Sequence, residues 1–123
     1  MSFVYFLISR DYPDQTYIGE TEDLNRRLRE HNSGNGSKFT KYYPPYAVFA
    51  YVCGFNGNKK LRLHFENEWK KEVPGLIREG VNCVIRWNLV ADKIIDRIKG
   101  SHEFHHENDL RLVMLFDPNN YAQ

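Results

Sequence analysis

The first twenty residues constrain the fold of this chain more than any other segment. An apolar and aromatic run from Phe3 to Ser9 leads into Arg10-Asp11-Tyr12-Pro13-Asp14, a sequence rich in turn-forming residues, and a second short run follows from Thr16 to Glu20. β-Branched and aromatic residues favour strands, whereas Pro and Asp favour turns. The chain is therefore expected to begin with two antiparallel strands joined as a hairpin.

A helix is expected directly after this hairpin. Thr21 can cap its first turn, and the two acidic residues that follow match the positive end of the helix dipole. The helix should run to about His31 and end at Asn32-Ser33-Gly34. The segment from Gly34 to Lys41 is rich in Gly, Ser and Asn, so we expect a mobile loop there.

The rest of the chain predicts one more strand in the sheet, two more helices and a short final strand. The strand covers Tyr46 to Phe55, and a helix over Lys59 to Lys71 is expected to end at Pro74-Gly75. A longer helix follows from Val81 to Ile98, and the short apolar run from Leu110 to Phe116 reads as a strand. The fold class is therefore predicted to be α+β, with a small three-stranded, mainly antiparallel sheet flanked by helices and a C-terminal helical extension.

The length of 123 residues fits one domain with a core of its own. We expect residues 1–72 to form the functional core and residues 73–123 to pack on it as a helix and a short strand. Cys53 and Cys83 are the only cysteines, no secretion signal is recognisable, and the apolar runs are too short to cross a membrane. A soluble intracellular protein of the cytoplasm or nucleus, with no membrane partner, is expected.

Charge is distributed unevenly along the chain. The formal net charge is +1, but the stretch from Leu24 to Lys71 holds ten basic and three acidic residues, and so carries +7. A localised basic face of this kind is typical of phosphate binding, although a solvated basic face without a partner is the alternative. The residues predicted to contact nucleic acid are Arg26, Lys38, Lys41, Tyr43, Lys59, Lys60, Arg62 and Lys70.

A group of polar side chains is expected to meet near the end of the hairpin. Arg27 and His31 are four residues apart and so project from the same face of the first helix. Tyr17 lies near the end of the strand that leads into that helix, and Gly19 shares its pleat face, where a glycine lets a ligand or another chain segment approach. Each residue alone is more often structural than functional, but the combination forms a pattern.

This pattern resembles the GIY-YIG nuclease superfamily. Its two short patches are similar to Val4-Tyr5 and Tyr17-Ile18-Gly19, and its Arg and His four apart on a helix are similar to Arg27 and His31. The likeness covers roughly residues 1–72. It implies a GIY-YIG endonuclease with a catalytic set made up of Tyr5, Tyr17, Gly19, Arg27, His31 and Glu66.

A narrower likeness points to the structure-selective branch of that superfamily, which cleaves branched DNA. In that branch a Gly-Phe pair is followed by a Phe-Glu pair with a Trp three residues beyond, as in Gly54-Phe55, Phe65-Glu66 and Trp69. The spacing selects Glu66 as the ligand of one Mg²⁺ or Mn²⁺ ion. With two cysteines, this chain is expected to lack the zinc module at the C-terminus of these relatives.

The resemblance implies a metal-dependent DNA endonuclease that hydrolyses a phosphodiester bond, with roles in DNA repair or recombination. Selectivity for branched or junction DNA, and a protein partner that provides targeting, are further expectations. Tyr17 is the first choice for activating the attacking water, with Tyr5 positioning it, and Arg27 would stabilise charge on the phosphate. The alternative is a non-catalytic or partner-dependent nucleic-acid-binding module of the same fold.

Three histidines near the C-terminus allow a second reading. His102, His105 and His106 could bind zinc together with Cys83, but they lack the spacing of a four-ligand site. A solvated polar loop is therefore the preferred interpretation.

Overall fold

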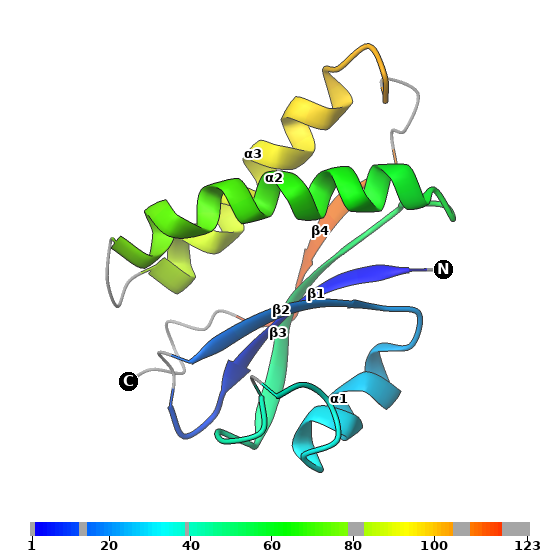
Figure 1. Ribbon diagram of the computed structural model, residues 1–123. Coiled ribbons are helices and arrows are strands. Elements are labelled where there is room, and N and C mark those ends of the chain that lie inside the picture. The colour runs from blue at the N-terminus through cyan, green and yellow to red at the C-terminus, as the bar shows by residue number, and fades with distance from the viewer. Residues whose placement is uncertain (1, 13–14, 39, 79–82, 105–108, 117–123) are drawn as a thin grey trace.

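The computed structural model describes residues 2–12, 15–38, 40–78, 83–104 and 109–116. It contains four strands and three helices in the order β1, β2, α1, β3, α2, α3 and β4 (Figure 1). Their bounds are β1 Phe3–Ser9, β2 Thr16–Thr21, α1 Leu24–Asn32, β3 Tyr46–Cys53, α2 Lys59–Arg78, α3 Cys83–Lys99 and β4 Arg111–Met114. The predicted α+β class is confirmed.

The strands form one antiparallel sheet in the order β2-β1-β3-β4. The predicted hairpin is present, and its register places Tyr5 opposite Gly19. A shift in register between Phe6 and Leu7 interrupts the pairing of β1 with β3. β2 and β4 are therefore the two edges of the sheet, and β2 carries Tyr17 and Gly19 of the predicted site.

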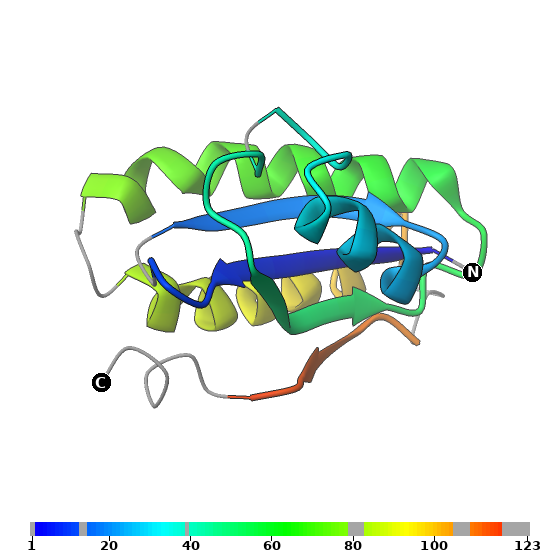
Figure 2. The same cartoon turned by 90° about the horizontal axis from the view of Figure 1, so that it is seen from below.

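Helices cover both faces of the sheet (Figures 1 and 2). α1 lies on one face, whereas α2 and α3 pack on the other, and Figure 2 shows α2 following the β2 edge. The larger apolar core forms under α2 and α3, where side chains of β1 and β3 meet Leu61, Phe65 and Trp69 of α2. The period of four along α2 explains this contact, since those three side chains share one face of the helix.

Two predictions about the sheet and α2 are wrong. The sheet has four strands, because the C-terminal strand β4 pairs with β3 instead of packing beside the core. α2 also does not end at Pro74-Gly75 but continues to Arg78. Proline removes one backbone hydrogen bond from a helix, a loss that tertiary packing can offset, and α2 does pack against α3.

The cap of α1 also differs from the prediction. Asp23 is the N-cap, and its side chain accepts a hydrogen bond from the backbone N–H of Arg26 at 3.0 Å. The Thr21 hydroxyl instead accepts from the backbone N–H of Asp23 at 3.1 Å. Thr21 therefore shapes the turn between β2 and α1, and Asp23 begins the helix.

Some expectations concern residues outside those described. Of the proposed histidine cluster, only His102 is described, because His105 and His106 fall within 105–108. Across the described ranges, no three His, Cys, Asp or Glu residues are grouped so that they could hold a metal ion. Nor does any described helix combine the length and apolar character needed to cross a bilayer.

Candidate active site

The side chains predicted to form the site come from four different elements. Tyr5 lies on β1, Tyr17 and Gly19 on β2, Arg27 and His31 on α1, and Glu66 on α2. Since side chains alternate along a strand, Tyr5 points to the α1 face, whereas its neighbours Val4 and Phe6 point to the apolar core under α2. The α1 face of β1 and β2 therefore carries the phenols, and the guanidinium and imidazole reach it from α1.

Gly19 is needed for Tyr5 to lie where it does. A Cβ atom at position 19 would lie 2.5 Å from the Tyr5 hydroxyl oxygen and 2.7 Å from its Cζ atom. Tyr5 is only 2% exposed, so its ring has little room to move away. Gly19 was expected to leave room for a ligand. In the structure, the space beside its Cα atom is taken by the hydroxyl end of Tyr5.

A chain of hydrogen bonds holds the buried imidazole of His31. The Tyr5 hydroxyl lies 2.8 Å from Nε2 of His31, and the Thr40 hydroxyl lies 2.6 Å from Nδ1. Nε of Arg27 donates to the Tyr5 oxygen at 3.4 Å, and the Thr40 hydroxyl donates to the backbone carbonyl of Ser37 at 3.2 Å. Because the Thr40 hydroxyl donates to Ser37, it is free to accept from the N–H of Nδ1, and Nε2 then accepts from the Tyr5 hydroxyl.

Burial keeps both members of this chain neutral. Loss of solvent and, to a smaller extent, the nearby Arg27 guanidinium together lower the pKa of His31 to about 4. Burial likewise raises the pKa of Tyr5 to about 12, against a smaller opposing effect of the hydrogen bond from Arg27. At neutral pH, Tyr5 is therefore a phenol and His31 an uncharged imidazole.

Arg27 is shared between the site and a neighbouring acid. Its Nη1 atom lies 2.7 Å from Oε2 of Glu30, and this hydrogen bond is the main reason that the pKa of Arg27 is raised. Its Nε reaches Tyr5 at the same time. The Arg27 side chain is 27% exposed, so its guanidinium is held by Glu30 and Tyr5 and still reaches solvent.

Tyr17 completes the aromatic part of the site. Its ring centroid lies 5.2 Å from that of His31 and 6.4 Å from that of Tyr5, in tilted or edge-on arrangements. It is half-buried, whereas Tyr5 is covered. Tyr17 is therefore the phenol of the pair that is open to solvent and to a ligand.

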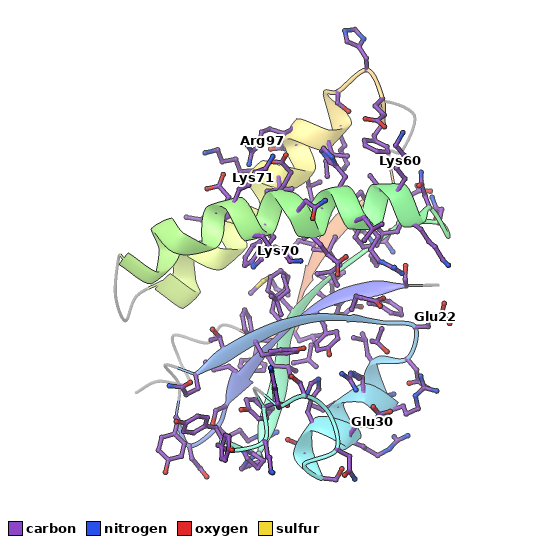
Figure 3. All side chains as sticks on the ribbon, viewed as in Figure 1. Glu22, Glu30, Lys60, Lys70, Lys71 and Arg97 are labelled. Atoms are coloured by element: carbon purple, nitrogen blue, oxygen red, sulfur yellow. The ribbon has the colours of Figure 1, made fainter. Side chains whose placement is uncertain are left out.

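Glu66 approaches from the opposite face of the sheet. It lines a cavity of about 80 Å³ with Ile18, Gly19, Trp69 and Lys70, at the β2 edge. Burial raises the pKa of its carboxyl group, although Arg62 and Lys70 act against that shift. Figure 3 shows Lys70 directed from α2 toward the sheet. Gly19 thus lies against Tyr5 and also lines the same cavity as Glu66.

Several of the basic residues predicted to bind nucleic acid lie beside the site. They line what we term the polar hollow, a depression of about 530 Å³ between the end of β2, α1 and the start of α2. Three of the predicted residues, Arg26, Lys59 and Arg62, lie here together with Arg27. The other lining residues are Glu20, Thr21, Glu22 and Glu30.

Several cations of the basic stretch form ion pairs in the structure. Arg62 pairs with Glu20 at 3.2 Å, Arg26 with Glu30 at 3.5 Å, and Lys60 with Glu103. Lys71 pairs with Glu68, which also contacts Arg97 of α3; Figure 3 shows Lys71 and Arg97 on the side of α2 away from Lys70. Among the described residues, half of the ten cations of the +7 stretch pair with acids, and two of these acids, Glu20 and Glu103, lie outside the stretch.

The remaining predicted contacts lie in the segment between α1 and β3. Nζ of Lys41 lies 6.0 Å from the ring centroid of Tyr42, and Tyr43 packs edge-on against Tyr12 at 5.2 Å. Lys38 is exposed in the same segment. None of these three is among the described residues that line the polar hollow or the Glu66 cavity.

Three residues of the site were missed from the sequence. Thr40 is 1% exposed and bonded to His31, although its segment was expected to be a mobile loop. Gly36 lies against the same imidazole, since a Cβ there would come within 2.4 Å of Nδ1. Glu20 follows Gly19 directly and pairs with Arg62. Only the glycine carried a local signal, because the partners of the other two are distant in sequence.

Comparison with known proteins identifies relatives of this arrangement. The family model described as the GIY-YIG catalytic domain matches residues 1–74. The structure-specific endonuclease subunit SLX1 of Malassezia globosa is 42% identical over 69 residues, which cover 54% of this chain but only 15% of that relative. Two UPF0213 proteins cover more of both chains. The one from Lactococcus lactis subsp. cremoris is 37% identical over 68% of this chain and 81% of its own length, and YsiG of L. lactis subsp. lactis is 33% identical over 77% and 88%.

Proposed function

Because this chain belongs to the GIY-YIG family, we propose that it is a DNA endonuclease that hydrolyses a phosphodiester bond with the help of one divalent metal ion. One observation carries the proposal. Gly19 at the β2 edge adjoins the hydrogen-bonded Tyr5 on one face of the sheet and the Glu66 cavity on the other. A phosphate at this edge would be within reach of phenol, guanidinium and carboxylate together.

Glu66 is the residue that would hold the metal. Its carboxylate is half-buried beside an open cavity, and within the described residues no ion pair occupies it. A single carboxylate at the wall of a cavity suits Mg²⁺ or Mn²⁺, which keep several water ligands. When bound, the metal would supply charge neutralisation on the scissile phosphate and the leaving oxygen. Bound metal would also offset the desolvation that raises the pKa of Glu66.

The two tyrosines would have different roles. Tyr5, with its pKa raised to about 12, stays protonated and uses its hydroxyl to hold His31 and the Arg27 guanidinium in place. Tyr17 is more open and lies against His31, so it is our choice for orienting and deprotonating the attacking water. Arg27 would contact the phosphate oxygens, for which its planar fork is well suited.

The substrate and partner are proposed by analogy with relatives. The SLX1 relatives are named structure-specific endonuclease subunits, which supports branched DNA as a substrate and a protein partner for targeting, in repair or recombination. This chain covers 15% to 16% of those relatives, so such properties could reside in their other parts. A DNA substrate is in keeping with action in the cytoplasm or nucleus.

A cleavage assay tests the proposal. Flap, fork, four-way-junction and plain duplex DNA would be incubated with Mg²⁺, with Mn²⁺ and with EDTA. We expect metal-dependent cleavage, and we expect Arg27→Ala and Glu66→Gln each to slow it by on the order of 10²- to 10³-fold, the usual cost of a lost charge-stabilising group.

Matched controls are available on the same helices. Arg29→Ala removes an exposed arginine two residues from Arg27, and Glu68→Gln removes a carboxylate two residues from Glu66 that pairs with Lys71 and Arg97. Both should retain most activity. Binding to DNA without cleavage in any metal would favour the alternative, a non-catalytic nucleic-acid-binding module. Cleavage at the wild-type rate by both site variants would refute the assignment.

A further inference from the structure

Arg62 lies in an unusual setting for an arginine. It belongs to the first half of α2, and only 18% of its side chain is exposed. Its Nε atom is buried and has no hydrogen-bond partner, while Nη1 lies 3.2 Å from Oε2 of Glu20. A buried guanidinium normally has its donors satisfied, because an unpaired buried donor is costly. Glu20 therefore satisfies this residue only in part.

The surroundings of Arg62 are those of an anion site. It opens into the polar hollow beside Lys59, which is exposed, and across from Arg26 and Arg27 of α1. Four cations line that hollow against the three carboxylates of Glu20, Glu22 and Glu30. Two of the acids are engaged with arginines, Glu20 with Arg62 and Glu30 with Arg27. These two acids thus pair with guanidinium groups that would otherwise be available to an anionic ligand.

Arg62 lies near the proposed metal ligand Glu66 on α2, and it lines the same hollow as Arg27, which would contact the scissile phosphate. Arg62 precedes Glu66 by four residues, so it lies one turn, about 6 Å, further along the same face of α2. Glu66 lines its own smaller cavity, which shares no residue with the polar hollow. This separation is comparable to the spacing between neighbouring phosphates of a DNA strand. Arg62 is therefore suited to contact a phosphate next to the one that is cut.

We propose that Arg62 and Lys59 bind a second phosphate of the DNA strand, next to the one that is cleaved, and that Glu20 occupies the Arg62 guanidinium until this phosphate replaces it. Phosphate and carboxylate present similar paired oxygens to a guanidinium, and phosphate can engage more of its donors. The proposal rests on the DNA endonuclease function above. It makes Glu20 a built-in competitor that weakens binding of DNA through the phosphate at this position.

Charge-matched variants test this directly. Binding of a fluorescent branched duplex to the whole chain would be measured in EDTA, where cleavage does not interfere. Glu20→Gln frees Arg62, and Glu22→Gln removes the same charge from the same hollow, where no described ion pair involves Glu22. We expect Glu20→Gln to tighten binding by about three- to tenfold at low salt and Glu22→Gln by less than about twofold, since the latter changes only the general field.

A neutral phosphate locates the contact. Methylphosphonate substitution, which removes one phosphate charge at a time, would be scanned over the positions that flank the cut. At one flanking position the gain of Glu20→Gln over the wild type should disappear, while at the others it should persist. Arg62→Lys retains the charge but lacks the fork, and should weaken binding and remove most of the gain in the double variant with Glu20→Gln.

Three results would overturn the inference: equal gains from Glu20→Gln and Glu22→Gln, a gain that no methylphosphonate position removes, or an undiminished gain in the Arg62→Lys background. None of these depends on cleavage. If the wild-type chain bound no DNA at all, the proposed function itself would fail. If it bound and cut DNA but showed one of these three results, only the second phosphate site would fail.

Discussion

The two faces of the sheet use aromatic side chains in different ways. Under α2 and α3, aromatic rings pack against one another. The ring centroid of Phe6 lies 4.9 Å from that of Trp69 and 5.9 Å from that of Phe49, and all three side chains are at most 1% exposed. On the α1 face, the rings of Tyr5 and His31 are equally buried but are joined through their polar atoms. One strand, β1, supplies both faces through its alternating side chains.

The difference shows how a small domain can separate stability from chemistry. The α2/α3 face buries mainly apolar area, so its contribution is mainly hydrophobic. The α1 face buries polar groups, which must be paired to be tolerated there, and this pairing holds them in a defined orientation. Substitutions on the two faces should therefore have different signatures.

The largest expected effect on stability comes from the apolar face. Phe65→Ala should lower the free energy of unfolding by about 3 to 5 kcal/mol, the usual cost of removing a buried phenylalanine ring. Urea denaturation would measure it. The fraction that stays folded should cleave DNA at a rate near that of the wild type.

Tyr5→Phe is the matched substitution on the other face. It keeps the ring and removes the hydroxyl, which leaves Nε2 of His31 unpaired at a cost of roughly 1 to 3 kcal/mol, and cleavage should fall much more than stability does. If Tyr5→Phe unfolded the domain as strongly as Phe65→Ala while folded protein stayed active, the separation of the two faces would be wrong.

The pH dependence of stability should identify the buried imidazole. The pKa of His31 is about 4 in the folded chain, against about 6.5 for an exposed histidine, so the unfolded chain binds the proton more readily. Stability from this group is fully present above pH 6.5 and is lost as the pH falls toward 4, by about 2 to 3 kcal/mol in total.

The difference in unfolding free energy between the wild type and His31→Gln isolates that contribution, because the effects of the other titrating groups are common to both proteins. Unfolding free energies from urea titrations at pH 4 to 7.5 should converge between the two proteins as the pH falls. His102→Gln, at an exposed position, should keep the wild-type dependence. A constant difference between wild type and His31→Gln across this range would contradict the assignment of a neutral buried imidazole.

The last prediction concerns Gly19, which lies against Tyr5 and lines the cavity of Glu66. Gly19→Ala would place a methyl group against the Tyr5 ring, and overpacking of this kind costs roughly 1 to 3 kcal/mol. We expect cleavage to fall as well, since Tyr5 would be displaced from His31. Gly100→Ala is the control, because a Cβ there would meet only ordinary contacts at 3.4 Å or more. Full activity of Gly19→Ala would show that Tyr5 does not need its present position.

Local patterns were enough to predict much of the fold. The turn residues between two apolar runs predicted the hairpin, and the period of four in α2 identified the face that packs on the sheet. Resemblance to the GIY-YIG family then marked Tyr5, Tyr17, Arg27 and His31, which the structure does bring together. Turns and amphipathic periods depend on near neighbours in the chain, so these features can be read without coordinates.

Pairing between distant segments could not be predicted in this way. The joining of β4 to β3, the hydrogen bond from Thr40 to His31 and the pairing of Arg62 with Glu20 each link residues whose proximity depends on the complete fold. The same reason explains why two acids from outside the +7 stretch, Glu20 and Glu103, pair with its cations.

By itself, the sequence determined the family, the α+β class and the residue types available for chemistry, because these follow from composition, spacing and local preference. The tertiary structure alone decided the state of those residues. It buried Tyr5 and His31 as neutral partners, left Tyr17 and Glu66 more open, and placed an acid on Arg62. Ionisation and pairing depend on solvent exclusion and on neighbours in space, and only the assembled fold sets both.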